Sequence, residues 1–164
     1  MVMAKLIGGA ALIAVQPASA HFAPRDSHTA EPAENPQDDA VRAVLSRYKS
    51  AIERLDPAGT ELLFTTDSTI FETGGAEGSY ANYLTHHLGP ELKEVKSFAF
   101  SDYKVDVRFE GPVALATETY DYRIVLKSGT VVERRGVATS VLRRENGQWK
   151  IVSMHNSARQ PRRP

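Results

Sequence analysis

The 164-residue sequence contains no cysteine. This absence excludes disulfide bonds, thiolate zinc sites, a cysteine nucleophile and a lipid-modified cysteine anchor. The chain also lacks an excess of charge of either sign, because 20 Lys and Arg residues balance 20 Asp and Glu residues. No extended positive field is therefore available to hold a phosphate backbone, and we do not expect nucleic acid as a partner.

Two further absences concern membranes and cofactors. The apolar run from Leu6 to Val15 is about half of the roughly 20 residues that span a bilayer. The Gly-x-Ser-x-Gly, phosphate-loop, dinucleotide-binding and His-Glu-x-x-His motifs are missing. His86 and His87 are adjacent, so on a helix they diverge and lack the spacing of metal ligands. We therefore expect no cofactor and no metal site.

Residues 1–20 have the pattern of a secretory signal peptide. Lys5 precedes the apolar run, and Ala18-Ser19-Ala20 has the small-x-small form of a cleavage site. We predict cleavage after Ala20 and export to the periplasm or the medium. The mature protein would begin at His21 and have no stable membrane insertion.

Composition divides the rest of the chain into three parts. Residues 21–37 hold three of the nine prolines and almost no large aliphatic residues, which is typical of a flexible tether. Residues 158–164 have a similar character and predict a disordered tail. Between them, residues 38–157 are a segment of about 120 residues, which is close to the commonest domain size.

The first part of this domain has the spacing of helices. Asp38 or Asp39 can cap a helix that runs to Leu55, with apolar residues three and four positions apart. The pattern then predicts a short second helix at 58–64 and a short strand at 68–72 that ends in a glycine turn.

A third predicted helix carries candidate site residues. Ser79 can cap this helix, and Gly89-Pro90 breaks or kinks it. One face is formed by Tyr80, Tyr83, Leu84, His87 and Leu88. His86 points about 100° away from that face. His87 is interpreted either as a histidine at the edge of the core, bonded to a backbone carbonyl, or as a residue that contacts ligand or transfers protons.

After Val95 the pattern changes to that of strands. Turns with Gly111, Gly129 and Gly147 separate them, and the predicted strands are 98–109, 113–126, 130–143 and 149–157. Four strands joined in this way form an antiparallel meander. Helices first and sheet second, without alternation, predict the α+β class.

The last strand carries a family resemblance. Its residues Gly147-Gln148-Trp149-Lys150-Ile151 are followed by His155 and Ser157. With the preceding helices and meander, this ending resembles the nuclear transport factor 2-like (NTF2-like) superfamily, especially its SnoaL-like and ketosteroid-isomerase-related domains, and is similar to the association domain of calcium/calmodulin-dependent kinases. The resemblance implies a cone-shaped, curved antiparallel sheet wrapped around N-terminal helices. It also implies an apolar cavity at the open end and a convex face that pairs two protomers in a homodimer.

The strand 113–126 offers two faces to this cavity. We predict that its even positions point inward, because a glutamate and two tyrosines above small residues suit a pocket that needs a few polar groups. These positions are Ala114, Ala116, Glu118, Tyr120 and Tyr122. An alternative is that Glu118 pairs across the strands with Arg134 or Arg135.

Glu72 ends the short predicted strand near the expected cavity. A carboxylate there could act as a general base on a carbon acid if burial raised its pKa. Glu72 and His87 are therefore the candidate catalytic residues. The candidate ligand-binding residues are Tyr80, Tyr83, His87, Glu118, Tyr120, Tyr122 and His155.

Three functions remain open from the sequence. The first is an exported protein that binds a small apolar molecule in the cavity. The second is a cofactor-independent isomerase, cyclase or dehydratase of the ketosteroid-isomerase type. The third is an assembly module whose pocket is vestigial.

Overall fold

The computed structural model describes residues 35–161 of the chain. In chain order the elements are α1 (Pro36–Glu53), the 3-10 helix η1 (Thr60–Leu63), β1 (Phe64–Glu72), β2 (Gly75–Gly78), α2 (Tyr80–Tyr83), the π-helical turn η2 (Leu84–Leu88), α3 (Gly89–Glu94), β3 (Val95–Glu110), β4 (Val113–Leu126), β5 (Val131–Glu145) and β6 (Gln148–Arg159). The predicted signal peptide, 1–20, lies outside the described residues, as does most of the predicted tether. Within the described part, no helix is long and apolar enough to cross a membrane.

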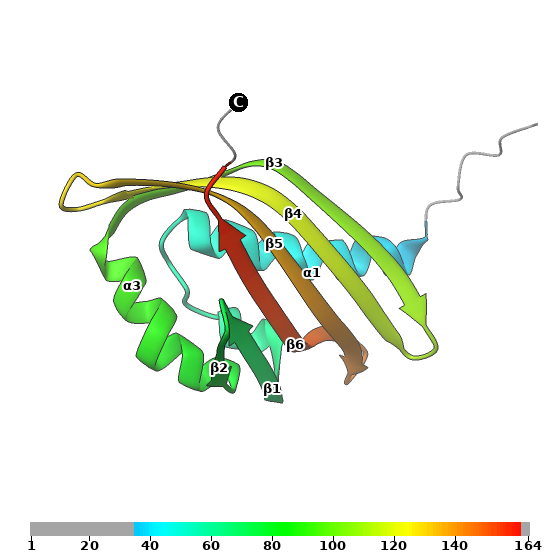
Figure 1. Cartoon of the computed structure of the whole chain (residues 1–164). Coiled ribbons are helices and arrows are strands. Elements are labelled where there is room, and N and C mark those ends of the chain that lie inside the picture. The colour runs from blue at the N-terminus through cyan, green and yellow to red at the C-terminus, as the bar shows by residue number, and fades with distance from the viewer. Residues whose placement is uncertain (1–34, 162–164) are drawn as a thin grey trace, which may run out of the picture. The chain divides into compact units, whose positions relative to one another are not determined.

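The strands form one six-stranded sheet in the order β2-β1-β6-β5-β4-β3. The neighbours in β3 to β6 are antiparallel, which confirms the predicted meander. β1 lies parallel to β6, so the sheet is mixed and not purely antiparallel as the resemblance implied. In Figure 1 the long strands curve over α1, and the α+β class is confirmed.

Helix α1 begins earlier than predicted. The Asn35 side chain accepts a hydrogen bond from the backbone N–H of Gln37 at 3.1 Å, so Asn35 is the cap and not Asp38 or Asp39. Pro36 suits the first helical position because its missing N–H needs no partner there. Pro36 and Gln37, which were assigned to the tether, are therefore helical.

The third predicted helix is interrupted but does not end at Gly89-Pro90. Ser79 caps it as predicted and accepts a hydrogen bond from the Asn82 N–H at 3.3 Å. α2, η2 and α3 follow one another without a gap, and we call them together the 80–94 helix. The wider π-helical turn precedes Pro90, whose ring clashes with the backbone of a regular helix. A Cβ atom on Gly89 would lie 2.6 Å from the Leu84 carbonyl oxygen, so this turn has no room for a side chain there.

The core lies between α1 and the inner face of the sheet. Val41 and Leu45 of α1 are buried, as are Leu142 of β5 and Ile151 of β6. The even positions of β4 point to this side, which confirms the predicted parity. β6 continues to Arg159, which pairs with Arg135. The first two residues of the predicted tail, Ala158 and Arg159, therefore belong to a strand.

The outer face of the sheet leads to a prediction about assembly. Val131, Val137 and Phe71 have exposed fractions of 45%, 40% and 41%. We expect these strands to pair with a second copy over a standard interface of at least about 1,200 Å². Light scattering should give twice the mass of the mature chain, and Val137→Lys should give the single mass. Leu62→Lys, a change in the exposed η1, is the control. A single mass for the unchanged protein at micromolar concentration would contradict the prediction.

Candidate functional site

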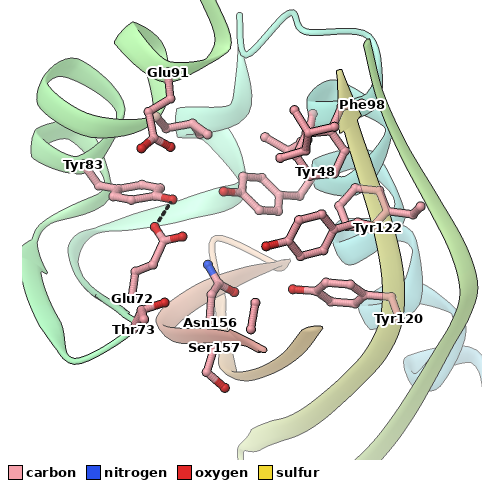
Figure 2. A pocket seen from close by; sticks show the side chains of 15 residues that line it. Tyr48, Glu72, Thr73, Tyr83, Glu91, Phe98, Tyr120, Tyr122, Asn156 and Ser157 are labelled. Carbon is pink, nitrogen blue, oxygen red and sulfur yellow. Dashed lines mark hydrogen bonds between the residues drawn. The ribbon is translucent and has the colours of Figure 1, made fainter. Parts of the chain in front are cut away.

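A cavity of about 210 Å³ lies between α1, the 80–94 helix and the inner face of the sheet (Figure 2). Its lining residues are Tyr48, Ile52, Glu72, Thr73, Tyr83, Leu88, Glu91, Phe98, Phe100, Tyr120, Tyr122, Ile124, Asn156, Ser157 and Ala158. Helix α1, the 80–94 helix, strands β1, β3, β4 and β6, and the turn after β1 contribute to this lining. The cavity is therefore a product of the tertiary fold.

One side of the cavity is aromatic. Phe98 and Phe100 of β3 alternate along the strand and contact the tyrosines of β4. The ring centroids of Phe98 and Tyr122 are 5.5 Å apart, and those of Phe100 and Tyr120 are 5.0 Å apart. Such distances are typical of packed aromatic pairs, which give this wall a defined shape.

The opposite side carries polar groups. Glu72 comes from the end of β1, Glu91 from α3 and Asn156 from β6. Figure 2 shows the hydroxyl groups of Tyr120 and Tyr122 pointing across the cavity toward this side. Among the described residues, the tyrosine hydroxyls that donate hydrogen bonds are those of Tyr80, Tyr83 and Tyr103. The hydroxyls of Tyr120 and Tyr122 are thus available to a ligand.

Glu72 is held in place by Tyr83. The Tyr83 hydroxyl donates a hydrogen bond to Glu72 Oε2 at 2.6 Å. Burial of Tyr83, together with the negative charge of Glu72, raises the pKa of Tyr83 far above that of a free tyrosine. Tyr83 therefore stays a neutral donor, and one oxygen of Glu72 is fixed while the carboxylate remains at the cavity.

His87, a predicted catalytic and ligand-binding residue, does not line the cavity but lies behind two of its carboxylates, and its partners are carboxylates and not the backbone carbonyl of the alternative. Its Nδ1 is 3.2 Å from Glu77 Oε2, and its Nε2 is 3.2 Å from Glu91 Oε1 and 3.8 Å from Glu72 Oε2. Partial burial acts to lower the pKa of His87, but the hydrogen bond to Glu77 and the charges of Glu91 and Glu72 outweigh it and raise the pKa. His87 thus links residues of β1, β2 and α3. No group of three or more His, Cys, Asp or Glu residues in 35–161 is placed to hold a metal ion.

We expect the stability conferred by His87 to depend on pH. The folded pKa is raised, so the stabilising effect of the protonated ring is complete below the unfolded pKa of about 6.5 and is lost as the pH rises through the folded value. His87→Ala should lower the free energy of unfolding by up to about 1 kcal/mol at pH 6 and by less at pH 9. Urea unfolding at both pH values measures the difference. His86→Ala, which removes an exposed ring of the same turn, is the control; equal effects of the two substitutions at pH 6 would contradict the prediction.

The structure brings four of the other predicted site residues to the cavity: Glu72, Tyr83, Tyr120 and Tyr122. Glu118 is buried next to the cavity, where it accepts a hydrogen bond from the Tyr103 hydroxyl. The alternative in which Glu118 pairs with an arginine is wrong. Glu118 lies opposite Ala138, and Arg135 binds Asp121 at 2.9 Å on the outer face.

Two predicted ligand-binding residues lie elsewhere. Tyr80 is a core residue with an exposed fraction of 1%, and its ring stacks on Phe64 with the centroids 3.6 Å apart. His155 is exposed on the outer face beside Phe71, because Met154 occupies the inward position before it. Side chains alternate along a strand, so His155 faces outward where Met154 faces the core.

Sequence reasoning also missed residues of the cavity. Tyr48 belongs to the apolar stripe of α1, and Phe98 and Phe100 alternate on β3. These patterns predict that the three side chains are buried, but they do not indicate that the side chains line a cavity. Glu91 lies beyond Gly89-Pro90, where the sequence left a break or a kink of the helix open, and the continuation of the helix brings it to the site.

Comparisons with known proteins identify the same fold. The family model for the SnoaL-like domain matches residues 41–161. A nuclear transport factor 2 (NTF2-like) superfamily protein from Salmonella enterica serovar Typhimurium is 19% identical, with 77% of this chain and 91% of that chain covered and a TM-score of 0.65. The resemblance to this superfamily, predicted from the last strand, is confirmed. A comparison with curated proteins finds no significant match.

Two other solved structures have names that mention activities. A ketosteroid isomerase-like protein from Erwinia carotovora atroseptica is 18% identical, covers 78% of this chain and 100% of its own length, and has a TM-score of 0.63. A hexachlorocyclohexane dehydrochlorinase is 12% identical, with coverages of 74% and 84% and a TM-score of 0.64. At these identities the similarity shows the fold, which hosts many functions.

Proposed function

Because the chain belongs to the family of SnoaL-like domains, we propose that it binds one small, largely apolar molecule in the cavity between α1 and the sheet. The observation that carries this proposal is the division of the cavity into two sides. Phe98 and Phe100 provide an apolar wall, while Glu72 and Asn156 face it. Pockets of this kind use the apolar wall for affinity and the few polar groups for orientation.

The volume limits the size of the ligand. Pockets for drug-sized compounds occupy about 300–1,000 Å³, whereas a cavity of about 150 Å³ accepts benzene. The cavity of about 210 Å³ therefore favours a compound with a single ring.

Calorimetric titration with toluene tests the proposal. We expect saturable binding at one site per chain, and we expect Ile124→Trp to abolish it because the indole fills the cavity. Leu62→Trp, at a position with an exposed fraction of 73%, is the matched control and should bind toluene normally. Absence of binding, or equal effects of the two tryptophans, would count against the proposal.

A second candidate function is proton abstraction from carbon without a cofactor. The bond of 2.6 Å from Tyr83 to Glu72, opposite the hydroxyls of Tyr120 and Tyr122, favours it. A ketone whose oxygen accepts from these tyrosines would place its neighbouring C–H bond toward Glu72. Glu72 would take the proton, the C–H electron pair would form a C=C bond, and the π pair of the C=O bond would move to the ketone oxygen to give an enolate. The names of the isomerase-like and dehydrochlorinase neighbours agree with chemistry of this class.

Exchange of the α-hydrogens of cyclohexanone with deuterium, followed by NMR, tests this second candidate. Glu72→Gln should reduce the catalysed rate by a factor of about 10² to 10⁴, which is the usual contribution of a general base. Glu77→Gln is the control, because Glu77 contacts His87 but does not line the cavity. A rate no faster than that of buffer would leave ligand binding as the function.

We also propose that the protein is exported, on the evidence of residues 1–20 alone. The mature protein should begin at His21, because Ala18 and Ala20 suit signal peptidase. Intact-mass spectrometry of the exported fraction measures this. Ile13→Arg, which interrupts the apolar run, should retain the precursor in the cell. An exported protein that still carries residues 1–20 would refute the prediction.

A further inference from the structure

A smaller compartment adjoins the main cavity. Its volume is about 30 Å³, which exceeds the roughly 10–15 Å³ that a cavity needs to hold one water molecule. It is lined by Tyr48, Lys49, Ile52, Phe100, Tyr103, Glu118, Tyr120, Ala138, Met154 and Asn156. Five of these residues also line the main cavity: Tyr48, Ile52, Phe100, Tyr120 and Asn156. The two spaces are therefore neighbours with a common wall.

The compartment contains a buried carboxyl group. Glu118 has an exposed fraction of 7%, and the Tyr103 hydroxyl donates to its Oε1. No ion pair among residues 35–161 includes Glu118, and the cation in the same lining, Lys49, binds Glu53 at 2.7 Å. Burial raises the pKa of Glu118, although the bond from Tyr103 acts in the opposite direction.

The buried Glu118 carboxyl group can accept more hydrogen bonds than the protein supplies. A buried carboxyl group normally has its acceptor sites satisfied, and leaving them without a partner is unfavourable. Tyr103 serves Oε1, and no other hydrogen bond to Glu118 is formed within the described part of the chain. Oε2 can therefore accept one more hydrogen bond.

We propose that the compartment is a subsite for one hydrogen-bond-donating group, a hydroxyl or an amine, of the ligand in the main cavity, with Glu118 as its acceptor. The inference rests on the proposed binding function and narrows the ligand class. A volume of about 30 Å³ admits one such group and no ring. The ligand is thus a single ring that carries a short substituent ending in a donor. Tyr120, which lines both spaces, contacts the ring and the substituent.

Toluene and benzyl alcohol test the subsite, because they differ by one hydroxyl group. We expect the unchanged protein to bind benzyl alcohol at least about tenfold more tightly than toluene, since the added hydroxyl gives the buried carboxyl oxygen the hydrogen-bond partner that it lacks. The double variant Tyr103→Phe/Glu118→Leu removes the acceptor together with its protein donor. It should bind benzyl alcohol no better than toluene, with the affinity for toluene changed less than about twofold.

The outcomes separate this proposal from the one on which it rests. If toluene binds and benzyl alcohol binds no more tightly, or keeps its advantage in the double variant, the subsite is wrong and the cavity remains a binding site. If neither compound binds, both proposals are wrong.

Carboxyl NMR of the unchanged protein gives a second measurement, should the double variant fail to fold. The Glu118 side-chain signal, assigned from its loss in Glu118→Gln, should shift with saturating benzyl alcohol and stay in place with toluene. A signal that benzyl alcohol leaves unmoved would overturn the subsite, because a purely structural pair with Tyr103 predicts that result.

Discussion

Replacement of Tyr80 by alanine is expected to lower the free energy of unfolding by about 3–5 kcal/mol, the range for removal of a buried aromatic side chain. Tyr80 has an exposed fraction of 1% and stacks on Phe64 at 3.6 Å. Its hydroxyl donates to Thr60 Oγ1 at 2.7 Å, and its backbone N–H donates to Ser68 Oγ at 3.1 Å. One side chain therefore joins η1, β1 and the 80–94 helix, and urea unfolding measures its loss.

Tyr80→Phe separates a core role from a ligand-binding role. This variant keeps the stacked ring and should lower the free energy of unfolding by about 0.5–1.5 kcal/mol, because it removes the bond to Thr60 while the Thr60 hydroxyl still donates to the Pro57 carbonyl. Its affinity for toluene should equal that of the unchanged protein. A large loss of affinity for toluene in a folded Tyr80→Phe protein would show that Tyr80 contributes to ligand binding after all.

Gly136→Ala is expected to weaken toluene binding at least about tenfold. Gly136 lies opposite Tyr120 on the neighbouring strand, and a Cβ atom there would be 2.2 Å from Tyr120 Cε2. The ring therefore has to move. Phe100 and Tyr103 already pack against Tyr120, so the open direction is the cavity, where the displaced ring takes the place of ligand. Calorimetric titration measures the change.

A second substitution shows whether this effect passes through Tyr120. In the Tyr120→Leu background the ring that collides with the new methyl group is absent. Addition of Gly136→Ala to Tyr120→Leu should then change the affinity for toluene by less than about twofold. The same tenfold loss in both backgrounds would show that Gly136 acts by another route.

Much of the fold was predictable because its signals are local. The strand predicted at 113–126 has the bounds of β4, and the small residues Ala114 and Ala116 correctly marked its inward face. The helical spacing also correctly predicted that Tyr83 lies at the cavity. It did not distinguish Tyr83 from Tyr80, which lies on the same helix face but belongs to the core. The difference depends on Phe64 and Thr60, which approach Tyr80 from other elements, and helical spacing carries no information about them.

The rest of the site depends on pairings that the sequence does not display. The parallel partner of β1 is β6, and this register places Glu72 beside Asn156. Alternation predicts two faces for β6 but does not say which one is inward. The family resemblance of His155 left the pocket and an interface equally open, and the side chain lies on the outer face. Glu91 was missed because a glycine-proline pair usually ends a helix, whereas here a π-helical turn absorbs it.

The parallel pairing of β1 with β6 also determines when the cavity can exist during folding. The Thr65 hydroxyl of β1 donates a hydrogen bond to the Ile151 carbonyl of β6, and these two residues are 86 positions apart in the sequence. Contacts at such separation form late, since the intervening chain must first lose its freedom. A growing chain that has not yet released its last strand has Glu72 but lacks Asn156 beside it. The cavity is therefore complete only when β6 has paired with β1, and loss of this last strand would remove Asn156, Ser157 and Ala158 from the lining.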